Sequence, residues 1–312
     1  MIKFNSKIYV AGHKGLVGSA IIRKLKEKGY KKILTADRKK LDLTNQIKVL
    51  KFLKRNKPEF IFIAAAKVGG IHSNNKFKAE FIHQNLSIQT NIIHSAYLSG
   101  IKSLIFLGSS CVYPRECKQP IKENYLLSGP LEKTNDAYAI AKIAGIKMCQ
   151  SYNEQYKTNY TCLMPTNTFG PNDNYHPLNS HFVPSIIRKI SLIKKRKLNF
   201  LNLWGNGKAR RELIYVDDLA DACIYFMNKK VKHNLINIGT GKDQTISYFA
   251  KKFLKILIPE KKILIKYDKS KPNGTPRKVL DVSLAKKYGW EAKSNFNQSI
   301  INTYNFFTKE NL

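Results

Sequence analysis

The sequence predicts an α/β protein with a doubly wound parallel sheet and a smaller C-terminal α/β lobe. Short apolar runs alternate with longer amphipathic runs through the first half of the 312 residues. This alternation is typical of parallel strands whose two faces are covered by helices. A glycine-rich turn also joins the first predicted strand to the first predicted helix. From Pro171 onward, prolines break the regular alternation. We therefore expect a first unit over residues 1–172, with a returning segment near residues 212–242, and a second lobe over residues 173–312.

The elements of the first unit follow from hydrophobic periodicity, because buried strands are short and apolar whereas helices repeat every three or four residues. The predicted strands are 8–11, 33–36, 60–64, 103–107 and 161–164, and the predicted helices lie near 17–28, 46–55, 77–98 and 137–156. Later helices are expected near 182–194 and 217–227. The apolar segment 236–239 is expected to rejoin the first unit as a strand.

A glycine-rich turn follows the first predicted strand. It reads Gly12-His13-Lys14-Gly15-Leu16-Val17-Gly18 and leads into an amphipathic helix. Glycines at such a turn let the backbone approach a pyrophosphate, and the helix amino terminus presents free N–H groups to it. The spacing is not the commonest fingerprint, but the strand before it and the helix after it favour a dinucleotide site over a simple tight turn.

Tyr138 stands four residues before Lys142 in a predicted helix. Residues at this spacing share one face of a helix. A tyrosine has an ordinary pKa near ~10, and a nearby cation favours the phenolate. We therefore expect Lys142 to lower the pKa of Tyr138, and the pair to exchange a proton with a carbonyl or alcohol oxygen.

The fourth predicted strand ends in Gly108-Ser109-Ser110-Cys111. Ligands of open parallel sheets bind beyond the carboxyl ends of the strands, which places these hydroxyl and thiol groups at the expected site. A serine-rich turn with one half-buried cysteine explains the segment equally well when it is taken alone.

Composition limits the classes of function. Five cysteines without a Cys-x-x-Cys spacing argue against a disulfide scaffold or a structural zinc site, and we expect no metal. No signal peptide or membrane span is predicted, so we expect a cytoplasmic protein without a membrane partner. The net charge of +34 is spread along the chain in short runs. This favours a basic surface that captures an anionic nucleotide, and we expect no nucleic-acid partner.

The three motifs, in this order, resemble the extended short-chain dehydrogenase/reductase superfamily, which implies a Rossmann-type fold. Further segments resemble the GDP-L-fucose synthase family within it. They are Ala64-Ala65-Ala66-Lys67-Val68-Gly69-Gly70-Ile71, Met164-Pro165-Thr166-Asn167, Asn179-Ser180-His181 and residues 271–278. The resemblance covers nearly the whole chain. It implies an NADPH-dependent enzyme that epimerises GDP-4-keto-6-deoxy-mannose at C3 and C5 and reduces the C4 ketone, which gives GDP-L-fucose. It also implies a homodimer, in which helices 77–98 and 137–156 are candidates for the pairing.

The resemblance assigns the catalytic residues Ser109, Cys111, Tyr138, Lys142 and His181. Cys111 takes a proton from the sugar and His181 returns one, while Ser109 and Tyr138 bind the C4 oxygen and Lys142 holds the nicotinamide ribose. The implied NADP(H)-binding residues are Gly12, His13, Lys14, Gly15, Leu16, Val17, Gly18, Arg38, Asp42, Leu107, Gly108, Ser109, Ser110, Lys142, Pro165, Thr166, Asn167, Thr168 and His181. The first unit is thus expected to bind NADP and the second lobe to bind the substrate through Lys189, Trp204, Arg211 and Asn273. Asn273 stands where relatives often carry an acid.

The choice between the two nicotinamide cofactors stays open at this point. Asp37 lies where an acid accepts the ribose 2′-hydroxyl of NAD. Arg38 follows it directly, and Arg38 or Lys14 could instead pair with the 2′-phosphate of NADP, the cofactor that the resemblance favours. Two other functions also remain: a sugar-nucleotide epimerase or dehydratase with retained NAD, and a non-catalytic dinucleotide-sensing or RNA-associated module.

Overall fold

The computed structural model of the chain describes residues 1–271 and 273–311. Pro272, part of the segment 271–278 quoted above, lies outside the described residues. At the centre is a parallel six-stranded sheet with the order β2-β1-β3-β4-β5-β9. Its strands are β1 (Ile8–Ala11), β2 (Ile33–Leu34), β3 (Phe60–Ile63), β4 (Ser103–Leu107), β5 (Asn159–Pro165) and β9 (Leu235–Ile238). The order reverses at β1, which creates the crevice where such sheets bind ligands.

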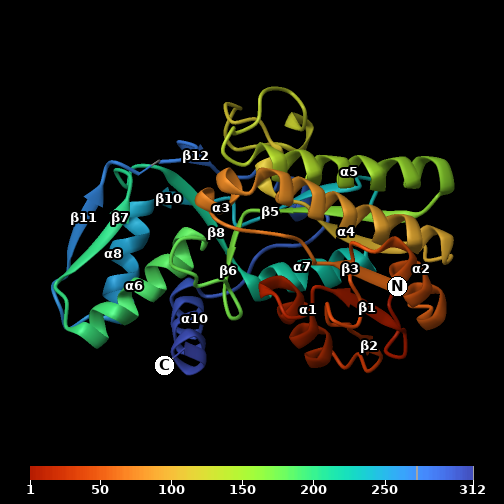
Figure 1. Cartoon of the computed structure of the whole chain (residues 1–312), viewed down its shortest axis with the longest axis horizontal. Helices are drawn as coiled ribbons and strands as arrows, with labels where there is room; N and C mark the ends of the chain where they lie inside the picture. The colour runs from red at the N-terminus through yellow and green to blue at the C-terminus, as the bar shows by residue number, and fades with distance from the viewer. Residues whose placement is uncertain (272, 312) are drawn as a thin grey trace.

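Helices cover both faces of this sheet, as the predicted doubly wound fold requires (Figure 1). On one face lie α2 (Gln46–Asn56), α4 (Lys78–Leu98) and α5 (Asp136–Tyr156), and on the other lie α1 (Leu16–Glu27) and α7 (Val216–Asn228). The strands β1, β3 and β9 are buried along their whole length, because side chains on both of their faces meet a helical layer. The Rossmann-type prediction is confirmed.

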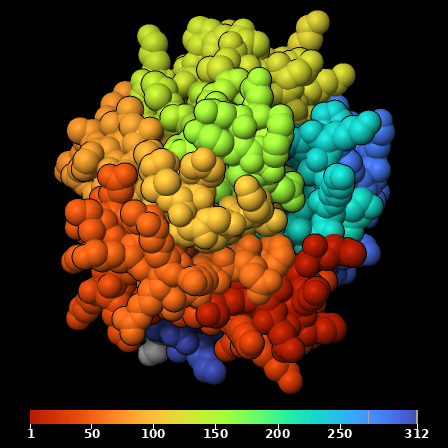
Figure 2. Space-filling model, turned by 90° about the vertical axis from the view of Figure 1, so that its right-hand side faces the viewer, coloured from red at the N-terminus to blue at the C-terminus, as the bar shows by residue number. Residues whose placement is uncertain are grey.

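The chain returns to the first unit after leaving it. β9 pairs with β5, and α7 packs along α1, so the predicted return of 236–239 as a strand is confirmed. Figure 2 views this unit from its outer end, where the cyan segment from the second half of the chain lies against red and green segments from the first half. The boundary placed at residue 172 stays a prediction.

The smaller lobe is built around the strand β8 (Arg210–Tyr215). It pairs with β6 (Asn167–Phe169), β10 (Asp243–Thr245) and β12 (Arg277–Lys278), while β7 (Phe200–Trp204) pairs with β11 (Leu264–Asp268). The remaining helices of this part are α6 (Phe182–Arg196), α8 (Ile246–Leu257) and α10 (Phe296–Asn311), whereas α9 (Ser283–Lys287) packs against β9 of the central sheet. In Figure 1 this lobe occupies the left side, with β12 reaching back toward the first unit.

Several boundaries differ from the predictions for local reasons. β2 ends at Leu34 rather than at residue 36, because it is an edge strand that pairs with β1 at two positions only. The helix predicted from residue 77 begins at Lys78, since Phe77 adopts a non-helical conformation between α4 and an unpredicted short helix, α3 (Ile71–Lys76). Two 3₁₀ turns, η1 (Ser110–Val112) and η2 (Glu123–Tyr125), are also unpredicted. Within the described ranges, no helix combines the length and apolar character that crossing a membrane needs.

Candidate active site

A cavity of about 960 Å³ opens at the carboxyl ends of the parallel strands and continues along the smaller lobe. Segments that follow β1, β2, β3, β4 and β5 form one side, and α6, β7, β8 and the segment before β12 form the other. Every residue assigned to a site from the sequence lines this cavity except Gly18. Gly12 and Asn273, which lie 261 positions apart in the chain, therefore line the same cavity from its two sides.

The glycine loop is shaped by close backbone packing. Gly12 has a φ of +84°, and a Cβ atom there would lie 2.6 Å from the backbone nitrogen of Ala65. Gly15 is the N-cap of α1 and offers no capping side chain, so the first N–H groups of α1 stay available to an anion. Gly18 lies behind the loop, where a Cβ would come 2.2 Å from the carbonyl oxygen of Gly12. Gly18 is not among the residues that line the cavity and lets α1 pack closely on the loop, so its contact with a cofactor stays a prediction.

The residues that choose between the cofactors meet at the rim. Asp37 pairs with Lys14, whose Nζ lies 2.8 Å from Oδ1, and with His13 at 3.2 Å. The hydrogen bond from Lys14 lowers the pKa of Asp37, which is thus an engaged carboxylate. Arg38 lines the cavity and is exposed. Asp42 accepts hydrogen bonds from the backbone and hydroxyl of Thr44, which lower the pKa of Asp42 and fix this corner of the wall.

The end of β4 turns sharply into the cavity. Ser109 caps the turn η1, and its Oγ accepts a hydrogen bond from the backbone N–H of Cys111 at 3.2 Å. Ser110 is buried, whereas Cys111 is half-buried and carries a free thiol. A Cβ at Gly108 would collide with the side chain of Met164, so glycine permits the tight passage of β4 beside β5.

Tyr138 and Lys142 both point toward this turn from α5. The Nζ of Lys142 lies 5.9 Å from the centre of the Tyr138 ring and donates a hydrogen bond to the carbonyl oxygen of Leu107 at 2.8 Å. Burial lowers the pKa of Lys142 to about 8. Burial also raises the pKa of Tyr138 well above its ordinary value, the charge of Cys111 adds to the rise, and the hydrogen bond with Ser109 opposes it. The expectation that Lys142 lowers the pKa of Tyr138 is therefore wrong for this structure, in which desolvation dominates.

Cys111 and His181 line the same cavity, and Lys278 links them electrostatically. The Nζ of Lys278 lies 3.7 Å from the Sγ of Cys111 and is placed to donate to it. The side-chain amide of Asn135 donates to the same sulfur at 3.3 Å. Burial lowers the pKa of His181, and the charge of Lys278 lowers it further. Neutral imidazole is thus favoured in the free protein.

The segment after β5 forms the floor between the two lobes. The hydroxyl of Thr166 and the side-chain amide of Asn167 both donate to the carbonyl oxygen of Glu212, at 3.3 and 2.9 Å. The hydroxyl of Thr168 donates to the carbonyl of Thr166 at 3.1 Å. These bonds tie β6 to β8, so Asn167 has a structural task besides any contact with a ligand.

Two cations face the far end of the cavity. Lys189 donates to the carbonyl oxygen of Asn202 at 2.8 Å, and burial lowers the pKa of Lys189. Arg211 donates from one Nη1 atom to the carbonyl oxygens of Arg210 and Thr275, at 2.8 and 2.6 Å, and burial lowers its pKa. A cavity that ends between a lysine and a fixed guanidinium suits a diphosphate.

Trp204 and Asn273 lie together at the same end. Trp204 is 37% exposed, which leaves part of its ring free to stack on a base. The Oδ1 of Asn273 accepts a hydrogen bond from the backbone N–H of Asn206 at 2.8 Å. Asn273 therefore holds the turn that follows Trp204, and the structure gives it this partner whether or not it also contacts a substrate.

The lining residues that were not assigned from the sequence include Glu132, Asn135, Asp173 and Lys278. Asn135 stands three residues before Tyr138, and Lys278 ends the segment 271–278, so proximity to the motifs was a usable signal for both. Asp173 lies in the irregular stretch after Pro171, where no periodicity marks it. Burial raises the pKa of Asp173 to about 7. Among the described residues, no three His, Cys, Asp or Glu side chains gather as a metal site requires.

Comparisons with known proteins agree with this geometry. The model of the NAD dependent epimerase/dehydratase family matches residues 8–239. A putative GDP-L-fucose synthase 2 of Arabidopsis thaliana is 47% identical, over 98% of this chain and 93% of the relative. A GDP-L-fucose synthase of Escherichia coli (strain K12) is 42% identical, with 96% of each chain covered.

A solved structure is also similar throughout. The GDP-mannoheptose C4 reductase MlghC of Campylobacter jejuni, solved with NADP bound, has a TM-score of 0.89 and 35% identity, over 99% of this chain and 100% of that one. The match of the family model to well over half of the residues, together with these relatives, shows that the chain belongs to the NAD dependent epimerase/dehydratase family.

Proposed function

We propose that this protein converts GDP-4-keto-6-deoxy-mannose to GDP-L-fucose, by epimerisation at C3 and C5 and reduction of the C4 ketone with NADPH. The observation that carries the proposal is the single cavity that gathers Ser109, Cys111, Tyr138, Lys142 and His181. The similarity to named GDP-L-fucose synthases over nearly the whole chain supports the same substrate.

The cofactor is NADP(H), and the residues present fit it. Gly12 leaves room that a Cβ would fill, α1 begins without a capping side chain, and Arg38 and Lys14 bring positive charge to the rim. Lys14 and His13 already pair with Asp37. The negative charge of that carboxylate is therefore balanced by its partners, and it repels a 2′-phosphate less. A bound reduced nicotinamide supplies the hydrogen and the electron pair that C4 receives.

Tyr138 and Ser109 act on the C4 oxygen. Since burial keeps the phenol neutral, Tyr138 is a proton donor to the oxygen as negative charge develops on it. Ser109 donates a second hydrogen bond to the same oxygen. Lys142, anchored on Leu107, holds the nicotinamide ribose and keeps positive charge behind the phenol.

Cys111 and His181 act on the carbons beside the ketone. The C4 carbonyl acidifies the hydrogens on C3 and C5, and removal of either as a proton leaves an enolate. Cys111 takes the proton as a thiolate, for which Lys278 and Asn135 supply stabilising N–H groups. His181, once it has taken up a proton from solvent, delivers it to the opposite face, which inverts the carbon. Lys189 and Arg211 bind the diphosphate, and Trp204 stacks on the guanine.

A second candidate function is reduction of a GDP-linked ketose without epimerisation. The similarity to the C4 reductase of Campylobacter jejuni favours it. The test is to incubate the protein with NADPH and GDP-4-keto-6-deoxy-mannose and to identify the product by NMR. GDP-L-fucose with equal consumption of NADPH supports the first proposal. A reduced product that keeps the C3 and C5 configuration of the keto sugar identifies the second, and a product formed without net NADPH consumption identifies an epimerase or dehydratase with retained cofactor.

We propose a homodimer formed through α4 and α5, located in the cytoplasm. Apolar side chains support the pairing, since Leu98 on α4 and Ile140 on α5 are 45% and 47% exposed. The free thiols of all five cysteines suit a reducing compartment. Light scattering during size-exclusion chromatography tests the dimer: a monomer mass at micromolar concentration would contradict it.

A further inference from the structure

Two cations of the cavity stand side by side on neighbouring strands. Lys278 on β12 is in parallel register with Arg211 on β8. Lys278 reaches Cys111, and Arg211 faces the far end of the cavity. β12 has only two residues, so its own ladder bonds are too few to hold it firmly.

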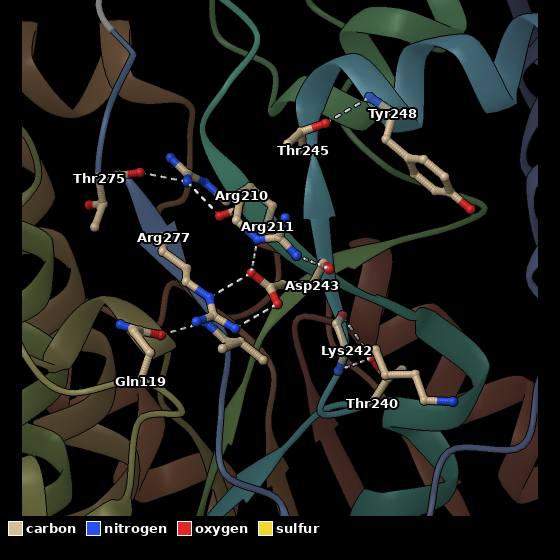
Figure 3. A network of polar contacts seen from close by, with 11 residues as sticks. Gln119, Arg210, Arg211, Thr240, Lys242, Asp243, Thr245, Tyr248, Thr275 and Arg277 are labelled. Carbon is tan, nitrogen blue, oxygen red and sulfur yellow. Dashed lines mark hydrogen bonds and ion pairs between the residues drawn. The ribbon is translucent and has the colours of Figure 1, made fainter.

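A buried carboxylate joins these two strands on the opposite face of the sheet. Side chains alternate along a strand, so Arg210 and Arg277, one residue before Arg211 and Lys278, point the other way. Both meet Asp243 of β10 (Figure 3). Its Oδ2 accepts from the Nε atoms of Arg210 and Arg277 at 2.7 and 2.8 Å, and its Oδ1 accepts from an Nη2 of Arg277 at 3.0 Å.

This arrangement needs the carboxylate. Arg210 and Arg277 are also in register, and two guanidinium groups on adjacent strands repel each other unless an anion lies between them. Burial alone would raise the pKa of Asp243, but the hydrogen bonds from Arg277 and Arg210 outweigh it and lower the pKa to about 2. Asp243 is thus an anion under all physiological conditions.

Backbone bonds anchor the residues that flank β12. The carbonyl oxygen of Pro276 accepts from the backbone of Arg210, and that of Val279 accepts from the backbone of Ile121. Between these anchors, the side chain of Arg277 is tied to Asp243. Loss of Asp243 would release the side chain of Arg277, and a small shift of β12 would then move Lys278 away from Cys111.

We propose that Asp243 is a positioning residue, which clamps Arg210 and Arg277 and thereby seats Lys278 against Cys111 and Arg211 in the cavity wall. Its effect on turnover rests on the function proposed above. Its effect on Cys111 does not rest on that function, because the Nζ of Lys278 lies 3.7 Å from the Sγ of Cys111 in the protein without a sugar.

The experiment therefore measures alkylation of Cys111 by iodoacetamide in the substrate-free protein at fixed neutral pH, with mass spectrometry of the Cys111 peptide. A Cys117→Ser background removes the other half-buried thiol. Asp243→Asn should slow the alkylation at least about threefold, because the thiolate reacts and the thiol does not. Arg277→Gln, which breaks only the β12 arm of the clamp, should do the same and serves if Asp243→Asn folds poorly. Asp217→Asn, which removes the ion pair with Arg23 between two residues that do not line the cavity, should leave the rate unchanged.

A double-mutant cycle separates positioning from general damage. In a Lys278→Met background, Asp243→Asn should have little further effect on Cys111, since the group it positions is already gone. The proposal would be overturned if Asp243→Asn slowed the alkylation of Cys111 equally in both backgrounds. It would also be overturned if Cys111 were alkylated at the wild-type rate in both Asp243→Asn and Arg277→Gln. If the wild-type protein fails to turn over the keto sugar, the function proposed above is wrong, and the alkylation cycle still decides whether the clamp exists.

Discussion

The Nζ of Lys142 donates a hydrogen bond to the carbonyl oxygen of Leu107 at 2.8 Å. The ammonium is thereby fixed at the carboxyl end of β4, one helical turn from Tyr138 and 5.9 Å from the centre of its ring. Because burial raises the pKa of Tyr138, the phenol keeps its proton. Tyr138 is therefore placed to act as an acid supported by a nearby cation.

Tyr138→Phe should lower the rate of ketone reduction about 100-fold or more, because the C4 oxygen loses its proton donor. Affinity for NADPH should change little, since the ring and its edge contact with Phe81 are retained. The rate is measured from NADPH absorbance with the keto sugar, and the affinity from NADPH fluorescence. Near-normal turnover in the variant would remove Tyr138 from the acid role.

Cys111→Ser should stop epimerisation while it leaves cofactor affinity intact. A serine hydroxyl is a far weaker base than a thiolate near Lys278, so exchange should fall about 100-fold or more. The measurement is incorporation of solvent deuterium at C3 and C5 of the keto sugar. Deuterium that still enters both carbons at the wild-type rate would show that another residue is the base.

Arg38→Ala should weaken NADPH binding more than NADH binding. A charge-assisted hydrogen bond to the 2′-phosphate is worth roughly 1.5–3 kcal/mol, which corresponds to a loss of about tenfold or more. NADH lacks that phosphate and should bind the variant almost as well as the wild type. Fluorescence titrations measure the affinities for both cofactors. Equal losses of affinity for NADPH and NADH would place Arg38 away from the phosphate.

Gly12→Ala should abolish cofactor binding and lower the melting temperature. The new Cβ would lie 2.6 Å from the backbone of Ala65, in a conformation with a φ of +84°. Gly100→Ala is the matched control, because Gly100 has a φ of +74° but nothing within 4 Å of the added Cβ. The control variant should be destabilised only by the strain of placing alanine at a positive φ, and it should still bind NADPH. Similar losses of NADPH binding and of melting temperature in both variants would mean that crowding at the loop is unimportant.

Asp243 should contribute stability that depends on pH in the acid range. Its folded pKa of about 2 lies below its ordinary value of 3.8, so the contribution is fully present above about pH 4 and is lost as the pH falls toward 2. The difference in melting temperature between wild type and Asp243→Asn should therefore be constant near neutrality and shrink below pH 4. A difference that grows on acidification would have the wrong sign for this carboxylate.

Much of the fold follows from local sequence, because buried parallel strands and amphipathic helices carry strong periodic signals. β1 and β4 match their predicted ranges for this reason. β12 could not be predicted, since two residues contain no period and their pairing with β8 depends on Asp243 from another strand. The glycine loop and the Tyr138–Lys142 pair were visible because their spacing is local.

The remaining parts of the site are set by tertiary contacts. Lys278 meets Cys111 across 167 positions of the chain, and no local pattern marks such a contact. The direction of the Tyr138 pKa was also beyond the sequence, because it depends on burial by surrounding segments rather than on the lysine one turn away. Gly18 was grouped with the cofactor by the spacing of the loop and by the family resemblance, although a Cβ there would meet backbone atoms of the loop.

The central claim is that a thiol and an imidazole invert the carbons beside a ketone in the pocket that also reduces it. The most direct measurement is incubation of the wild-type protein with GDP-4-keto-6-deoxy-mannose in D₂O, followed by addition of NADPH and NMR of the product. The account predicts GDP-L-fucose with deuterium at both C3 and C5. A reduced sugar of unchanged configuration that carries no deuterium at those carbons would contradict it.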